Sequence, residues 1–152
     1  MALLNGIHHL TTLTADLDRL IGFYERVFAA RVIIDLEEEG LRHAFIELGP
    51  TTVLHPFQVP GVEVPQHQIP FFQRGRLDHF ALNAASEEAF RELRRRVLAE
   101  GAGDGEVTDM GSLLNFGFTD PDGASHEVVW VKPGIPLERG LRRAEWTTVD
   151  LE

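Results

Sequence analysis

The sequence contains no cysteine among its 152 residues. Disulfide bonds, thiolate metal ligands and a thiol nucleophile are therefore excluded. Long apolar runs are also missing, since none approaches the roughly 18 residues that a membrane span requires. The opening residues, MALLNGIHH, have neither the basic region nor the apolar stretch of a secretory signal. These absences favour a soluble, cytoplasmic protein that has no membrane partner.

Positive charge is scarce as well. The chain has 14 Lys and Arg against 24 Asp and Glu, which gives a formal net charge of −10. That balance argues against binding to a phosphate backbone, so we expect no nucleic-acid partner. With 43% hydrophobic and 25% charged residues the composition is that of a globular protein. The length suits one ordinary domain, and we predict a single domain over residues 1–152.

The first part of the chain predicts a strand, a helix and three more strands. A strand rich in threonine and apolar residues is expected over 6–14, and Asp16 is the expected N-cap of the helix that follows. Further strands are expected at 31–36, 43–49 and 52–57. This series forms a first module over about residues 6–60.

The second part repeats that order. A strand is expected at 77–84, a helix at 86–101 capped by Ser86, a short strand at 106–111 and a hairpin at 113–131. A proline-rich linker loop over about 58–75 separates this second module, about 76–132, from the first, and a tail over 133–152 stays unassigned. His67 lies in the linker loop and is a candidate to approach a substrate.

An internal repeat relates the two modules. Aligning HLTTLT with HFALNA places His9 on His79, and the same offset matches the apolar faces of the two helices. At the far end of each module, His55 falls on Glu127. If a pseudo-twofold axis relates the halves, equivalent positions face one cleft from opposite sides.

The cleft would then hold three imidazoles and one carboxylate. We predict that His9, His55, His79 and Glu127 bind a divalent metal ion such as Fe(II), Mn, Ni, Co or Zn, with open positions for water or substrate. His9, His79 and Glu127 alone would form a facial triad of two histidines and one carboxylate. The other histidines of the strands are expected to be structural or on the surface; they are His8, His43 and His126.

Three stretches resemble the vicinal oxygen chelate superfamily: HHLTTLTADLDRLIGFYERVF, LDHFALNA and FTDPDGASHEVVW. That superfamily includes glyoxalase I, methylmalonyl-CoA epimerase, extradiol dioxygenases, fosfomycin-resistance enzymes and bleomycin-resistance proteins. The resemblance covers about residues 6–132. It implies an α+β fold in which two paired βαβββ modules form a half-barrel cleft around a metal site.

The resemblance also implies which residues bind the metal. The first ligand in such proteins lies seven residues before the aspartate of the DLDR element, which selects His9 and turns His8 outward. The last ligand lies four residues after the glycine of DPDG, which selects Glu127. Pairing of such modules is common within and between chains, so we expect a homodimer.

The residue at position 55 bears on the reaction. Glyoxalase I has a glutamate at the position of His55, where it also serves in proton transfer. Extradiol dioxygenases use the positions of His9, His79 and Glu127 as an iron triad with a separate histidine for proton transfer, a role for which His55 and His67 are the catalytic candidates. Aromatic residues are expected to line the cleft; they are Phe57, Phe71, Phe72, Phe116 and Phe118.

These observations favour a metal-dependent enzyme that binds a small substrate through two neighbouring oxygens, leaning to a ring-cleaving dioxygenase. One alternative is a glyoxalase I-like lyase or an epimerase. Another is a metal-free ligand-binding protein of the bleomycin-resistance type.

Overall fold

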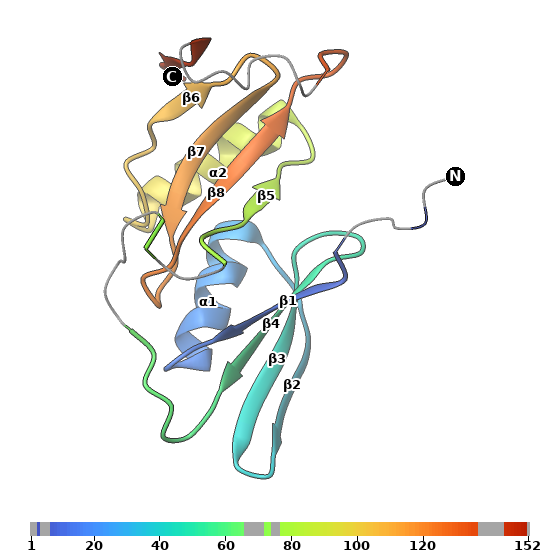
Figure 1. Ribbon diagram of the computed structural model, residues 1–152, viewed down its shortest axis with the longest axis vertical. Coiled ribbons are helices and arrows are strands. Elements are labelled where there is room, and N and C mark those ends of the chain that lie inside the picture. The colour runs from blue at the N-terminus through green and yellow to red at the C-terminus, as the bar shows by residue number, and fades with distance from the viewer. Residues whose placement is uncertain (1–2, 4–6, 66–71, 74–76, 137–144, 152) are drawn as a thin grey trace. The chain divides into compact units, whose positions relative to one another are not determined.

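The computed structural model describes residues 3, 7–65, 72–73, 77–136 and 145–151. The chain divides into two compact units, Met1–His67 and Gln68–Glu152 (Figure 1). Within the described residues, no helix is long and apolar enough to cross a membrane. The elements are, in chain order, β1 (His9–Leu13), α1 (Leu17–Phe28), β2 (Val32–Glu38), β3 (Leu41–Glu47), β4 (Val53–Gln58), β5 (Ala81–Asn83), α2 (Glu87–Ala99), β6 (Val107–Asp109), β7 (Leu113–Thr119), β8 (Ser125–Val131) and β9 (Thr147–Val149).

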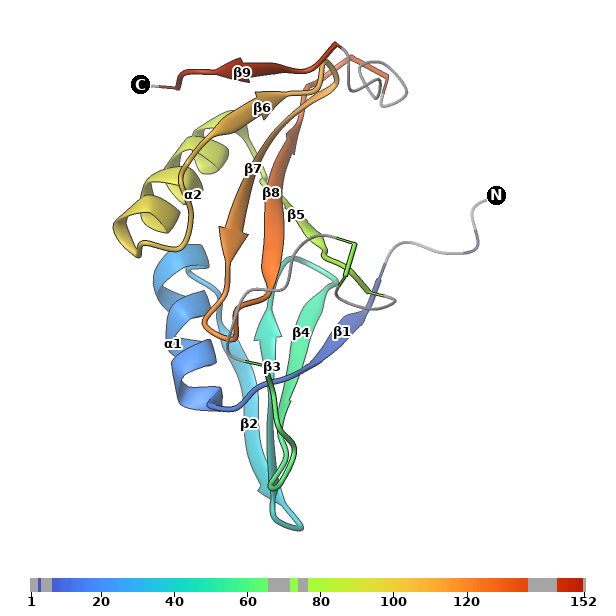
Figure 2. The same cartoon turned by 60° about the vertical axis from the view of Figure 1, so that its left-hand side comes forward.

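The first unit is a βαβββ module. Its sheet has the strand order β1-β4-β3-β2, in which β1 runs parallel to β4 and the other pairs are antiparallel. The helix α1 starts where expected, because the Asp16 carboxylate accepts a hydrogen bond from the Arg19 amide at 3.0 Å. Its apolar side packs against β3 and β4 and so covers one face of the sheet (Figure 2).

The second unit repeats this order of elements. Its sheet has the order β5-β8-β7-β6-β9, with β5 parallel to β8. The helix α2 begins after Ser86, whose hydroxyl accepts a hydrogen bond from the Ala89 amide at 3.1 Å, and it packs against β8. The structure therefore confirms the α+β fold of two βαβββ modules.

Part of the unassigned tail belongs to the second sheet. The strand β9 pairs with the edge strand β6, and buried Leu151 follows it. The Arg94 guanidinium of α2 donates hydrogen bonds to the carbonyl oxygens of Gly105, at 2.7 Å, and Leu151, at 2.9 Å. The end of the chain thus covers a strand edge that would otherwise expose unpaired backbone groups.

Strand alternation separates a core face from an open face in each sheet. In the second unit, Phe116 and Phe118 are almost fully buried on the side of α2, where Phe116 packs edge to face with Phe90 at 5.0 Å between ring centroids. The expectation that these two phenylalanines line a cleft was therefore wrong. Gly117, between them, lies on the opposite, exposed face.

The close approach of the loop after α2 to β7 requires a glycine at position 103. A Cβ atom on Gly103 would lie 2.7 Å from the carbonyl oxygen of Gly117 and 3.0 Å from a methyl group of Val97. We expect Gly103→Ala to destabilise the protein by about 1–3 kcal/mol, as overpacking does, because a backbone atom of a central strand cannot move aside. Urea unfolding measures the change. Gly49→Ala is the matched control, since its Cβ would meet nothing within 4 Å.

Candidate metal centre

The strand registers place the repeat-related residues at equivalent positions. Thr11, two residues after His9, pairs with His55, and Ala81, two residues after His79, pairs with Glu127. Each pair therefore lies diagonally across two parallel strands, on the sheet face turned away from the helix of its unit. The strand β5 is shorter than expected, so that His79 precedes it by two residues. Each unit thus brings two of the four predicted ligands together.

In the first unit the pair consists of two imidazoles. The ring centroids of His9 and His55 are 5.8 Å apart. His8 is exposed, but its Nδ1 lies 2.9 Å from Nδ1 of His9. His8 is therefore on the surface, as expected, although its ring turns toward that of His9. His8 comes before the first residue of β1, where the alternation of a regular strand does not apply.

A third imidazole lies beside this pair. Nδ1 of His43 is 3.0 Å from Nε2 of His55, although the sequence favoured a surface role for His43. The His43 ring stacks on Phe57 with 5.1 Å between centroids, and Phe45 packs its edge against His55 at 4.3 Å. Because β3 and β4 pair with His43 opposite Phe57, the side chains of His43 and His55 fall on the same face. A histidine in each arm of a predicted hairpin was the sequence signal that could have found this contact.

Burial lowers the pKa of His55 below its ordinary value, and the neighbouring imidazoles of His43 and His9 lower it further. A histidine with a lowered pKa is neutral at pH 7. One ring nitrogen of His55 therefore keeps a lone pair, which both a metal ligand and a proton acceptor require.

In the second unit the pair consists of an imidazole and a carboxylate. Nε2 of His79 lies 3.7 Å from Oε2 of Glu127, and both side chains are partly exposed. On the other side of the ring, Nδ1 of His79 lies 3.1 Å from Oδ1 of Asp78. An ionised carboxylate only accepts hydrogen bonds, so Nδ1 of His79 is the donor, and the lone pair of the neutral ring is then on Nε2, beside Glu127. A carboxylate on the far nitrogen is the usual arrangement of a histidine that binds a metal, so this pair fits a divalent ion.

The remaining candidates do not join these pairs. His126 lies on the core face, stacked on Phe80 at 3.8 Å between centroids, which agrees with the structural role expected for it. Phe72 is 90% exposed. His67 and Phe71 lie outside the described residues. Over the part of the chain that the structure describes, no three or more His, Asp or Glu side chains form a group that could hold a metal ion.

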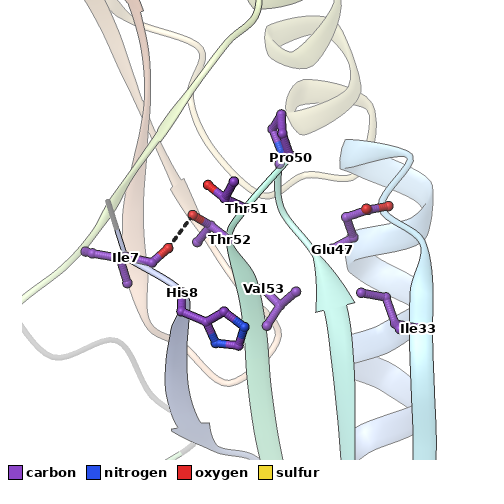
Figure 3. A pocket seen from close by; sticks show the side chains of 9 residues that line it. Ile7, His8, Ile33, Glu47, Pro50, Thr51, Thr52 and Val53 are labelled. Atoms are coloured by element: carbon purple, nitrogen blue, oxygen red, sulfur yellow. Dashed lines mark hydrogen bonds between the residues drawn. The ribbon is translucent and has the colours of Figure 1, made fainter. Parts of the chain in front are cut away.

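A pocket of the first unit is lined by His8, the neighbour of His9 in the chain (Figure 3). It has a volume of about 430 Å³, and its lining comes from the segment before β1, from β2, and from the β3–β4 turn with the strand ends that flank it. The lining residues include His8, Ile33, Glu47, Thr52 and Val53. Two lining residues of this pocket are joined by a hydrogen bond, which the Thr52 hydroxyl donates to the Ile7 carbonyl oxygen at 2.7 Å. The volume falls in the range of sites for small molecules, about 300–1,000 Å³.

Comparison with known proteins connects this geometry to one family. Residues 6–128 match the family model described as the Glyoxalase/Bleomycin resistance protein/Dioxygenase superfamily. No curated protein matches the chain significantly.

Solved structures of glyoxalase-type proteins have a fold similar to that of this chain. A glyoxylase/bleomycin resistance protein/dioxygenase domain from Frankia sp. EAN1pec is 20% identical with a TM-score of 0.64, covering 87% of this chain and 96% of its own. A mutant of the fosfomycin resistance protein FosX from Listeria monocytogenes, complexed with Mn(II) and 1S,2S-dihydroxypropylphosphonic acid, is 20% identical with a TM-score of 0.62, covering 92% of this chain and 100% of its own. A glyoxalase I mutant from Zea mays is 21% identical with a TM-score of 0.61, covering 81% of this chain and 44% of its own.

Proposed function

This chain belongs to the Glyoxalase/Bleomycin resistance protein/Dioxygenase superfamily, and from that premise we propose that it is a metal-dependent enzyme. Its substrate would be a small molecule that binds through two neighbouring oxygen atoms. Among the reactions of this superfamily, we favour ring cleavage by a dioxygenase mechanism.

One observation carries the proposal. Each βαβββ unit places two potential ligands at repeat-equivalent positions, His9 with His55 and His79 with Glu127. The Asp78 carboxylate beside Nδ1 of His79 adds support, because a metal-binding histidine almost always donates its other ring N–H to such a partner. His9, His79 and Glu127 would hold the metal, and His55 would be a fourth ligand or an acid–base group.

The charge of the donor set indicates the kind of substrate. Three neutral imidazoles and one carboxylate leave a divalent ion with a charge of about +1, which favours an anionic pair of oxygens such as a catecholate or enediolate. A bound divalent ion would supply Lewis-acid polarisation of those oxygens. Phe45 and Phe57, which pack against His55, would exclude water from its ring.

The residue at position 55 favours one reaction within the superfamily. Glyoxalase I, in the resemblance described above, has a glutamate there, so this chain has one carboxylate fewer for moving a carbon-bound proton. A neutral His55 can instead accept a proton from a substrate hydroxyl, as a ring-cleaving reaction requires. His67 stays a second candidate for this role.

Reconstitution of the protein tests the proposal. The purified chain is loaded anaerobically with Fe(II), Mn, Ni or Zn, and each form receives a panel of catechols followed by oxygen. We expect oxygen uptake and a yellow ring-cleavage product, both lost in His79→Ala. Thioester formation from the methylglyoxal–glutathione hemithioacetal without oxygen uptake would overturn the dioxygenase proposal in favour of a lyase. Neither reaction, together with tight binding of an apolar ligand to the metal-free protein, would indicate the sequestering type.

We also propose that the chain forms a homodimer. The strand β2 is at the end of its sheet and exposes Ile33 and Leu36, and such an edge is commonly covered by another chain. Light scattering at micromolar concentration should therefore give twice the 17.0 kDa chain mass. A single species at 17.0 kDa would contradict the expectation.

Mixing two inactive variants shows whether a site draws ligands from one chain or two. Chains carrying His9→Ala are combined with chains carrying Glu127→Ala, and mixed dimers are isolated. If each site takes one unit from each chain, one of the two sites in a mixed dimer is intact and metal binding returns to half of the sites. If each site lies within one chain, the mixed dimer binds no metal.

A further inference from the structure

Both carboxylate oxygens of Asp78 accept hydrogen bonds. Its Oδ1 accepts a hydrogen bond from Nδ1 of His79 at 3.1 Å, and its Oδ2 accepts one from the backbone amide of Phe72 at 2.8 Å. The side chain is 20% exposed, so these bonds are partly shielded from water. Phe72 adopts a left-handed backbone with φ of 67°, which is unfavourable for a residue with a side chain.

Nδ1 of His79 and the amide of Phe72 are both hydrogen-bond donors to Asp78. A carboxylate accepts from both at once, whereas an amide side chain offers one acceptor and one donor. The carboxylate therefore keeps the His79 proton on Nδ1 and the lone pair on Nε2, which lies 3.7 Å from Glu127.

We propose that Asp78 is a positioning residue of the metal centre. It selects the tautomer of His79 that can bind a metal through Nε2, and through Phe72 it connects the segment before β5 to that ligand. The proposal deepens the metal-dependent function proposed above and rests on it for the role of Nε2. The choice of tautomer itself can be measured without metal.

Asp78→Asn separates this role from a merely structural one. The asparagine oxygen can still accept the Phe72 amide, and its NH₂ group then faces Nδ1 of His79 as a donor. His79 must move its proton to Nε2 to accept that bond, which removes the lone pair from the side of Glu127. If Asp78 only anchored Phe72, this variant would behave as the wild type.

The experiment compares the full-length wild type, Asp78→Asn, Asp78→Ala and the charge-matched control Asp150→Ala. Asp150 is exposed and follows β9, at the opposite edge of the sheet from β5. Ring ¹⁵N shifts of His79 in the metal-free proteins, recorded in mildly alkaline buffer, report which nitrogen carries the proton. Competition with a chelator measures the affinity for Mn(II) and Zn(II), and circular dichroism checks that each variant is folded.

We expect the Nδ1–H form of His79 in the wild type and the Nε2–H form in Asp78→Asn. Metal affinity should fall about 10- to 100-fold in both Asp78 variants, the usual cost of removing such a partner, and stay unchanged in Asp150→Ala. A wild-type His79 protonated at Nε2, or an Asp78→Asn protein with wild-type tautomer and affinity, would overturn the proposal. If no protein binds metal, the proposed function fails, and the wild-type and Asp78→Ala tautomers still decide the role of Asp78.

Discussion

Glu127→Gln and His79→Ala are each expected to lose bound metal, with the metal affinity falling by more than about 100-fold. Removing a residue that only hydrogen-bonds to a metal ligand already lowers the affinity about 10- to 100-fold, and removing the ligand itself should cost more. Glu127→Gln keeps the shape of the side chain and removes its negative charge, so the loss reports coordination rather than packing. His9→Ala should have the same effect from the first unit. Elemental analysis of the purified proteins and chelator competition measure the change.

The controls for this prediction lie in the same histidine cluster. His55→Ala should weaken binding less than His9→Ala, since His9, His79 and Glu127 suffice for a facial triad. His8→Ala should keep most of the metal, because His8 is exposed and water can replace its contact with His9. Full metal content in the His9, His79 and Glu127 variants would refute the ligand assignment.

Phe90→Ala is expected to have the largest effect on stability, a loss of about 3–5 kcal/mol. Phe90 is fully buried on α2 and packs edge to face against Phe116 of β7. Alanine would leave a cavity at the contact of helix and sheet that the surrounding strands cannot close. The free energy of unfolding of a native protein is about 5–15 kcal/mol, so the second unit of Phe90→Ala should unfold at a much lower urea concentration than that of the wild type.

Phe72→Ala is the matched control for the core variant. It removes the same ring from a side chain that is 90% exposed, so its unfolding free energy should stay within about 0.5 kcal/mol of the wild type. Equal losses for the two phenylalanines would show that burial on α2 does not determine the effect.

The sequence by itself determined the two helices, the repeat and the equivalence of the candidate ligands in the two modules. These features have local signals: Asp16 and Ser86 mark the helix starts, and apolar spacing marks the buried faces. The repeat aligned His9 with His79 and His55 with Glu127 without any contact information, and the registers of the parallel strands place them at equivalent positions of the two sheets. A repeated order of elements is visible in one dimension because each module folds by the same local rules.

Only the tertiary structure decided which other groups lie beside those residues. The contact of His43 with His55 depends on the register between β3 and β4, and the burial of Phe116 depends on which face of β7 meets α2. Pairing of β9 with β6 joins segments that are far apart in the chain. Register and facing are set by the packing of whole sheets, and a shift of one residue would reverse every side chain, so no short stretch of sequence contains them.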